Sequence, residues 1–108
     1  MGAEKAVKHG ISMNIAGGTH HAFSNKGEAF CLLYDQTIAA KYLINNKKIN
    51  KILIVDLDVH QGNGTASIFK SNKKVFTFSM HGAKNFPFKK EKSDLDIELE
   101  ENTQMKNI

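Results

Sequence analysis

The sequence predicts an α/β protein built around a parallel β-sheet. Apolar runs typical of strands alternate with segments of helical periodicity, and glycines separate most of these segments. The run at 51–57, KILIVDL, is almost continuously apolar and rich in Ile and Val, as in a strand buried on both faces of a parallel sheet. With 108 residues, the chain is long enough for one small domain or for part of a larger one.

The first half of the chain is expected to contain a helix, a strand and a second helix. Residues 3–9 have the character of a helix end, and Gly10 is a typical stop signal. Residues 11–16, ISMNIA, form a short apolar run of strand type. Residues 28–46 are the strongest helix candidate, because apolar side chains recur there at spacings of four and seven.

The second half continues the alternation. After the strand at 51–57, a short helix is expected at 65–71, a strand at 74–80 (KVFTFSM) and a weaker strand at 96–100 (DIELE). Parallel strands are joined by right-handed crossovers, and ligands of such sheets bind beyond the carboxyl ends of the strands.

Composition restricts the classes of protein to consider. A hydrophobic fraction of 41% is compatible with a packed core, and the single Cys31 excludes an internal disulfide and suits a reducing, cytoplasmic compartment. No apolar run reaches about 18 residues, so we expect no membrane span. The net charge of +4 comes from lysine clusters without a nucleic-acid-binding motif, so we expect no direct nucleic-acid partner.

Three loops that follow predicted strands carry polar or histidine residues: GGTHH, DVHQGNG and MHGAKNFP. Because the carboxyl ends of parallel strands meet at one edge of the sheet, these loops are expected to lie together. In the second loop, Asp58 and His60 are two positions apart and point the same way on an extended segment. An oxygen and a nitrogen ligand favour Zn²⁺ or Fe²⁺, and a catalytic zinc usually has three protein ligands.

The neighbouring residues fit proton transfer. Asp56 lies one step deeper, where a carboxylate needs a partner: a histidine N–H, backbone amides or a monovalent cation. His20 and His21 are candidate bases for a metal-bound water and candidate acids for a leaving amine. Asn63 could orient one of these rings through its carbonyl oxygen. Each motif alone also fits a plainer interpretation, namely a helix cap, a solvated loop or a surface histidine pair.

Four motifs, GGTHHA, AFCLLYD, IVDLDVHQGNGT and VFTFSMH, resemble in order and spacing those of the zinc-dependent histone deacetylase family. That family has an arginase-like three-layer α/β fold with a parallel sheet, and its members hydrolyse the amides of acetyl-lysine or acylated polyamines. The HQGNG form, where many members have His-His-Gly-Asp-Gly, is similar to the class IV branch and to bacterial relatives. The resemblance covers nearly the whole chain.

The resemblance implies a role for each matching position. Asp58 and His60 would bind Zn²⁺, with Fe²⁺ as the alternative, and His20 and His21 would be the tandem catalytic histidines. Asp56 would support His20, and Asn63 would support His21 where many members have Asp. Two further sets are implied, a narrow acyl-lysine tunnel lined by Phe30, Phe86 and Gly18, and a structural K⁺ site formed by Asp56, Asp58, His60, Ser79 and Met80.

The sequence also departs from the family pattern. Ala29 stands where Gly is usual, and Tyr34 stands where some members have Asn. Family members are much longer, and their third zinc ligand, an Asp, and their transition-state Tyr have no counterpart after Asp96. We therefore expect residues 1–108 to be a partial, central deacetylase domain with negligible deacetylase activity on its own, and its partner to be the remainder of such a domain or another subunit.

Three functions are compatible with these observations. The first is a zinc-dependent deacetylase in which a metal-bound water attacks the acyl carbonyl and the histidine pair moves protons. The second is an inactive truncated or split product with a partner-binding role. The third is a phosphotransferase of the haloacid dehalogenase type, which the Asp56-Leu57-Asp58 sequence would fit but which leaves His20 and His21 unexplained. A cytoplasmic location is expected, or a nuclear one in a eukaryote.

Overall fold

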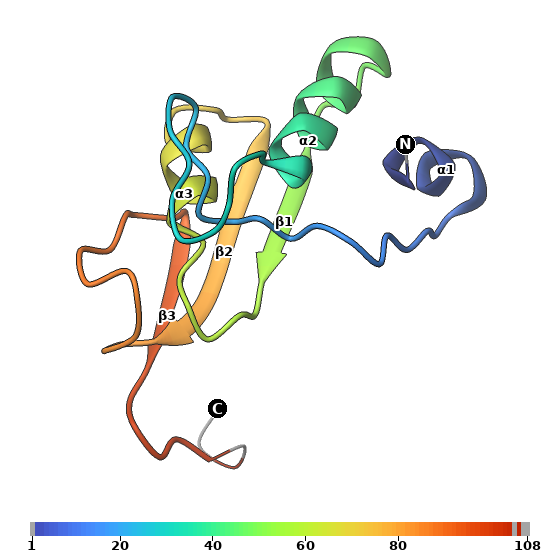
Figure 1. Cartoon of the computed structure of the whole chain (residues 1–108). Helices are drawn as coiled ribbons and strands as arrows, with labels where there is room; N and C mark the ends of the chain where they lie inside the picture. The colour runs from blue at the N-terminus through green and yellow to red at the C-terminus, as the bar shows by residue number, and fades with distance from the viewer. Residues whose placement is uncertain (1, 105, 107–108) are drawn as a thin grey trace.

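The computed structural model describes residues 2–104 and 106. Its elements, shown in Figure 1, are α1 (Gly2–His9), α2 (Asp35–Asn46), β1 (Ile52–Asp56), α3 (Asn63–Phe69), β2 (Val75–Gly82) and β3 (Leu95–Leu99). The strands form one parallel sheet in the order β1-β2-β3. The predicted α/β class with a parallel sheet is therefore confirmed.

The register of the sheet places three polar residues side by side across the strands, at the carboxyl end of β1. Asp56 of β1 pairs with Ser79 of β2, and Ser79 pairs with Asp96 of β3. Partners in a parallel ladder point to the same face of the sheet. The inner face, which carries α2 and α3, therefore changes from apolar residues at the start of β1 to polar ones at its end.

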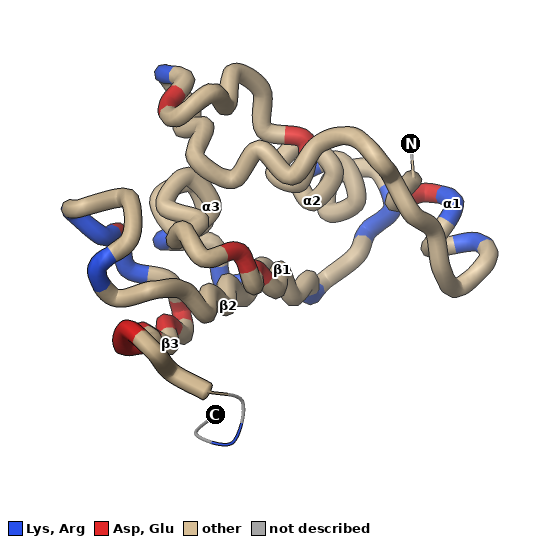
Figure 2. The backbone as a smooth tube through the Cα atoms, turned by 60° about the horizontal axis from the view of Figure 1, so that its bottom comes forward, with Lys and Arg blue, Asp and Glu red and all other residues tan. Residues whose placement is uncertain are grey.

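The core lies between this inner face and the two helices. Figure 2 shows α2 and α3 on the same side of the strands. Ala40 of α2, Phe69 of α3 and Val75 of β2 form one buried cluster, and the half-buried Ile52 and Ile54 of β1 pack against it. α2 and α3 need this contact, because short helices are marginal without the packing of an apolar face.

The outer face of the sheet is apolar but exposed. Leu53 and Val55 of β1 are 62% and 50% exposed, and Phe76 of β2 is 48% exposed. The sequence-based expectation that 51–57 is buried on both faces is therefore wrong for this structure. The reason is that burial on two faces needs a second covering layer, and no described helix packs on this side.

Residues 11–16 are not a strand, in contrast to the prediction. They form an irregular segment that links α1 to the loop carrying His20 and His21, and Ile11, Met13 and Ile15 are more than four-fifths exposed. An apolar run becomes a strand only when a neighbour pairs with its backbone, and none of the described residues does so here. The helix before it ends as expected: Gly10 has a φ of 89°, and its N–H donates to the Ala6 carbonyl.

The second helix begins at Asp35 rather than at residue 28. Glu28 and Cys31 exchange two backbone hydrogen bonds around a tight turn, and its central residues Ala29 and Phe30 have φ values of 47° and 68°. Positive φ at both central positions defines a type I′ turn, which cannot continue into a helix. The boundaries of the other elements lie close to the predicted ones.

Candidate functional site

The chain beyond β1 is folded by its own carboxylates. Asp56 Oδ1 accepts a hydrogen bond from the Asp58 N–H at 3.0 Å. Asp58 Oδ1 in turn accepts one from the His60 N–H at 2.8 Å. These two successive side-chain turns, each of the type that Asp favours, set the course of the loop that carries all three side chains.

The Asp58 and His60 side chains come together as a candidate metal-binding pair. Asp58 Oδ1 and His60 Nδ1 are 3.1 Å apart, and their side chains are 50% and 44% exposed. Two ligands of a tetrahedral zinc, with bonds of about 2.0 Å, lie about 3.3 Å apart, so this pair fits one edge of such a site. Within residues 2–104 and 106, no cluster of three or more His, Cys, Asp or Glu side chains could hold a metal ion.

His20 is paired with Asp56 and lies next to this pair. Its Nδ1 is 2.5 Å from Asp56 Oδ2, and both side chains are 11% exposed. The carboxylate can only accept a hydrogen bond, so His20 Nδ1 carries the proton. His20 Nε2 then lies 3.9 Å from Asp58 Oδ1, which joins this imidazole to the metal-binding pair.

His21 is held by an amide instead of a carboxylate. Its Nδ1 is 2.7 Å from Asn63 Oδ1, and both residues are buried. The His21 ring stacks at a tilt on His20, with centroids 4.1 Å apart, and lies edge-on to His60 at 6.1 Å. The structure thus brings both histidines, both supports and the metal-binding pair into one place.

Two glycines of the HQGNG segment allow this close approach. A Cβ on Gly62 would lie 2.3 Å from Asp56 Oδ2, and one on Gly64 would lie 2.2 Å from the Ala22 carbonyl oxygen. The Gly64 N–H donates to the His20 carbonyl at 3.0 Å. The start of α3 therefore contacts the backbone of the histidine segment directly. A side chain at Gly64 would force these two segments apart, and one at Gly62 would displace the Asp56 carboxylate.

The two histidines have pKa values that shift in opposite directions. Burial lowers the pKa of His20, but the hydrogen bond and charge of Asp56 outweigh it and raise the pKa above its ordinary value. Burial lowers the pKa of His21 more than the Asn63 hydrogen bond raises it, and the charges of His20 and His60 lower it further. His20 therefore favours the charged form and His21 the neutral one.

The candidate ligand Asp58 is held in its charged form. Burial raises its pKa, but the His60 N–H and the charges of His20 and His60 more than reverse this, so the pKa lies below its ordinary value. A charged carboxylate is the form that binds a metal ion.

Of the three residues expected to line a tunnel, Phe86 lies against the histidines, Phe30 is exposed and Gly18 precedes the histidines in the chain. Phe86 lies edge-on to His21, with ring centroids 5.0 Å apart, and 6.5 Å from His60. Phe30, on the type I′ turn, is fully exposed, and its ring contacts no other ring of the described part of the chain. Gly18 precedes the histidines with a φ of 78°, and its N–H donates to the Asp35 carboxylate.

The remaining residues of the expected K⁺ site lie on β2. Ser79 is 2% exposed and stands beside Asp56 in the sheet, and Met80 follows it. The Ser79 hydroxyl is 2.9 Å from Nδ1 of the buried His81. Of the residues expected to bind K⁺, the structure therefore places Asp56 and Ser79 side by side in the sheet.

A model of the histone deacetylase domain matches residues 2–107. The chain belongs to the histone deacetylase family. An uncharacterised protein of Picosynechococcus sp. is 54% identical over 99 residues, and histone deacetylase 2 of Arabidopsis thaliana is 31% identical over 88 residues. The crystal structure of a histone deacetylase homologue from Aquifex aeolicus superimposes with a TM-score of 0.76 at 28% identity over 91% of this chain.

The chain covers only part of each of these family members. It spans 33% of the Picosynechococcus protein, 23% of the Arabidopsis deacetylase and 30% of the Aquifex homologue. It has part of the arginase-like α/β fold of the histone deacetylase family. Within residues 2–104 and 106, no helix is both long and apolar enough to cross a membrane.

Three residues that position this deacetylase-family site were missed by the sequence analysis. Asp35 fixes the backbone at Gly18 and Thr19, and the buried Gln61 joins the loop after β1 to Glu91 and Asp96. Glu28 accepts a hydrogen bond from Asn63. A glutamate seven residues after His21, in an irregular segment, has no periodicity or spacing that would indicate such a contact.

Proposed function

We propose that this chain forms the metal-binding and proton-transfer part of a zinc-dependent amide hydrolase that deacylates acyl-lysine or a related acylated amine. The observation that carries the proposal is the grouping of His20–Asp56 and His21–Asn63, at 2.5 and 2.7 Å, around the Asp58–His60 pair. Membership of the histone deacetylase family supports the same reaction class.

Asp58 Oδ1 and His60 Nδ1 are the two atoms of this chain that would hold zinc. When bound, zinc lowers the pKa of a water molecule to about 7 and polarises the carbonyl of an amide. Two protein ligands are fewer than the three of a typical catalytic site, so this chain alone is expected to bind zinc weakly.

His21 is the proposed general base. Its Nδ1–H donates to Asn63, so Nε2, on the opposite edge of the ring, has the lone pair. The lowered pKa of His21 keeps that nitrogen free to take a proton from the attacking water. The same nitrogen, once protonated, can deliver the proton to the leaving amine.

His20 is proposed to act as a positive charge beside the reaction. Its raised pKa, from the Asp56 partner, favours the imidazolium form. A pair of titratable groups with pKa values pushed apart in this way separates into one charge-stabilising group and one base. A fixed imidazolium near a carbonyl stabilises the negative charge that develops on its oxygen.

An activity assay tests this assignment. Because the chain spans 33% of the Picosynechococcus relative, it can replace the matching segment of that protein, and the chimera can be assayed on an acetyl-lysine peptide with Zn²⁺. We expect the chimera to deacetylate the peptide, and His21→Ala to lower its rate by about 10²–10⁴-fold. His9→Ala, which removes an exposed histidine of α1, is the matched control and should leave the rate unchanged.

The proposal fails if the unmodified relative deacetylates the peptide while the folded chimera does not. It also fails if the chimera turns over equally well with His21→Ala. Substrates that differ in the acyl chain and in the amine, a lysine peptide against a polyamine, then define the substrate class.

A structural K⁺ at Asp56, Asp58, His60, Ser79 and Met80, with the carbonyl and hydroxyl oxygens as ligands, stays a prediction, as do a cytoplasmic or nuclear location and the absence of a nucleic-acid partner. K⁺ binding is checked by comparing thermal stability in KCl and in tetramethylammonium chloride, with Ser79→Ala as the variant that removes one oxygen.

We also propose that the outer face of the sheet is covered by the remainder of a deacetylase domain. Apolar residues of all three strands lie on that face, among them Leu53, which is 62% exposed. An exposed apolar surface of this kind marks an interaction site. The Aquifex homologue, of which this chain spans 30%, shows that further polypeptide accompanies this segment in a relative.

A further inference from the structure

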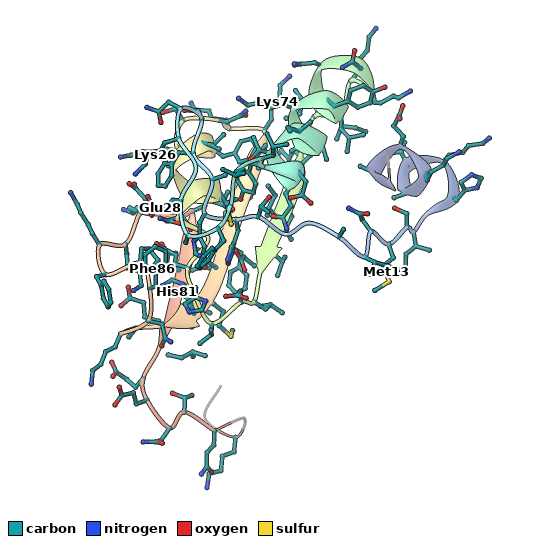
Figure 3. The ribbon with its side chains drawn as sticks, in the orientation of Figure 1. Met13, Lys26, Glu28, Lys74, His81 and Phe86 are labelled. Carbon is teal, nitrogen blue, oxygen red and sulfur yellow. The ribbon has the colours of Figure 1, made fainter. Side chains whose placement is uncertain are left out.

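Behind His21 lies a chain of three hydrogen-bonded side chains. His21 Nδ1 contacts Asn63 Oδ1 at 2.7 Å, Asn63 Nδ2 donates to Glu28 Oε1 at 2.9 Å, and Glu28 Oε2 pairs with Lys26 Nζ at 2.7 Å. Figure 3 shows Lys26 and Glu28 together on the loop before α2, on the same side of the molecule as Phe86. The carboxylate of Glu28 thus stands between an amide and an ammonium group.

Glu28 determines which end of the Asn63 amide faces His21. A carboxylate accepts hydrogen bonds and donates none, so the atom of Asn63 that faces Glu28 must be nitrogen. The oxygen of Asn63 then faces His21, which requires the proton of that ring to be on Nδ1. Without an acceptor-only neighbour, the amide could turn over and donate to His21 Nδ1, which would leave the proton on Nε2.

Burial and backbone geometry enforce this arrangement. Asn63 is 2% exposed and His21 is 5% exposed, so water cannot easily replace either partner. Glu28 is the first residue of the type I′ turn, and its N–H and C=O both pair with Cys31. The hydrogen bond of Lys26 lowers the pKa of Glu28 and, together with that of Asn63, outweighs the opposing effect of burial, so the carboxylate favours its charged form.

We propose that Glu28 is a positioning residue for the deacylation: by fixing the orientation of the Asn63 amide, it keeps Nε2 of His21 as the proton acceptor. This inference rests on the proposed function for its catalytic meaning, but the tautomer itself does not. It also gives a reason for Asn at position 63. An Asp there would face Glu28 across the 2.9 Å now spanned by a hydrogen bond, and two carboxylates at that distance cannot both be charged.

The test reads the tautomer of His21 directly. In the purified protein with ¹⁵N-labelled histidine, two-bond ring couplings in NMR distinguish protonated Nδ1 from protonated Nε2. We expect Nδ1–H as the main form in the unmodified chain. In Glu28→Gln, the side chain at position 28 has the same shape as Glu28, but Lys26 attracts the oxygen of the new amide, so the amide nitrogen faces Asn63. The Asn63 amide then turns over and donates to Nδ1 of His21. Nε2–H becomes the main form of His21.

A second substitution should reverse this change. In the Glu28→Gln/Asn63→Asp double variant, the carboxylate introduced at position 63 accepts hydrogen bonds from both the new amide at position 28 and His21, so Nδ1–H is restored. Asn63→Asp alone should be less stable than either the unmodified chain or the double variant, because two carboxylates then face each other. Glu101→Gln, at an exposed glutamate that pairs with Lys84, is the matched control and should leave His21 unchanged.

Two results overturn the proposal: Nε2–H as the main form of His21 in the unmodified chain, or Glu28→Gln with the tautomer unchanged. The first needs no variant, so it applies even if a substitution prevents folding. Since the tautomer is read without substrate, a shift seen in a protein that does not deacylate would support the positioning role and count against the proposed function alone. In an active protein, Glu28→Gln should lower kcat by at least about tenfold with little change in KM.

Discussion

Adjacent histidines occupy different electrostatic environments in this chain. His20 has a carboxylate partner and His21 an amide partner, at similar distances and with similar burial. The difference of one formal charge between Asp56 and Asn63 decides whether the partner outweighs the effect of burial. The sign of the pKa shift therefore follows from the identity of the partner.

Replacing the carboxylate should reverse the shift of His20. With Asp56→Asn, the lowering effect of burial is no longer outweighed, so we expect the pKa of His20 to fall below its ordinary value of 6.5. The pKa of His21 should rise, because the neighbouring charge of His20 that lowers it is reduced. An NMR titration of the histidine ring protons measures both values. Asp94→Asn, which removes the same charge elsewhere, is the control, and a His20 pKa that stays raised in Asp56→Asn would contradict the assignment.

The same substitution has a pH-dependent effect on stability. The folded-state pKa of His20 is raised, so the stabilisation from its pair with Asp56 is complete below pH 6.5 and is lost as the pH rises through that raised value. Asp56→Asn should therefore lower the free energy of unfolding by about 1.5–3 kcal/mol at the acidic end and by less at alkaline pH. Urea denaturation at several pH values measures this difference.

The sequence could predict these residues but not all of their partners. The D-x-D-x-H spacing and the histidine pair indicated Asp56, Asp58, His60, His20 and His21, because the carboxyl ends of parallel strands share one edge of a sheet. Glu28 could not be predicted from spacing, because its position depends on the type I′ turn at Ala29 and Phe30. Neither residue is typical of positive φ, so the turn has no sequence signal.

At the scale of the elements, α3 contacts the histidine segment backbone against backbone. A Cβ on Gly64 would lie 2.2 Å from the Ala22 carbonyl oxygen and 2.8 Å from that of His20. Both atoms belong to the backbone, which cannot move aside as a flexible side chain can. The position of α3 therefore depends on having no side chain at residue 64.

Gly64→Ala should destabilise the protein although alanine is the better helix former. We expect a loss of about 1–3 kcal/mol in the free energy of unfolding, from overpacking that exceeds the gain in helix propensity. Gly2→Ala, at a helical glycine whose added Cβ would meet only an ordinary 3.4 Å contact, is the matched control. Equal stability of Gly64→Ala and the unmodified chain, by urea denaturation, would show that this contact does not fix α3.

The elements show where sequence patterns succeed and fail. β1, α3, β2 and β3 lie close to their predicted bounds, whereas α2, which also packs in the core, begins at Asp35 rather than at residue 28. The segment at 11–16 has the same apolar character as a strand but is exposed, since nothing among the described residues pairs with it. An apolar pattern indicates which element a segment could form, whereas backbone pairing and packing decide whether the element forms.

At the scale of the whole molecule, the two faces of the sheet differ in whether helices cover them. The inner face is covered by α2 and α3, whereas the outer face exposes Leu53, Val55, Phe76 and Leu95 by 47% or more. The edge backbone of β1 is also unpaired among the described strands. Such a surface favours association with other polypeptide.

Placing charge on this face should reduce self-association of the chain. We expect Leu53→Lys/Val55→Lys to shift the chain toward the monomer in sedimentation velocity, because the lysines disrupt the apolar surface without altering the inner core. Asn45→Lys/Asn50→Lys adds the same charge at exposed positions off the sheet and is the control. An equal shift in both variants would mean that net charge, rather than the outer face, governs association.

We propose that the loop after β1 binds a metal ion directly beside His20 and His21. The most direct measurement is a Co²⁺ titration of the chain with ¹⁵N-labelled histidine, because a paramagnetic ion broadens NMR signals steeply with distance and needs no tight binding. We expect the ring signals of His60, His20 and His21 to broaden first, His9 to be spared, and His60→Ala to abolish the effect. Broadening of His9 alone, or undiminished broadening of His20 and His21 in His60→Ala, would contradict it.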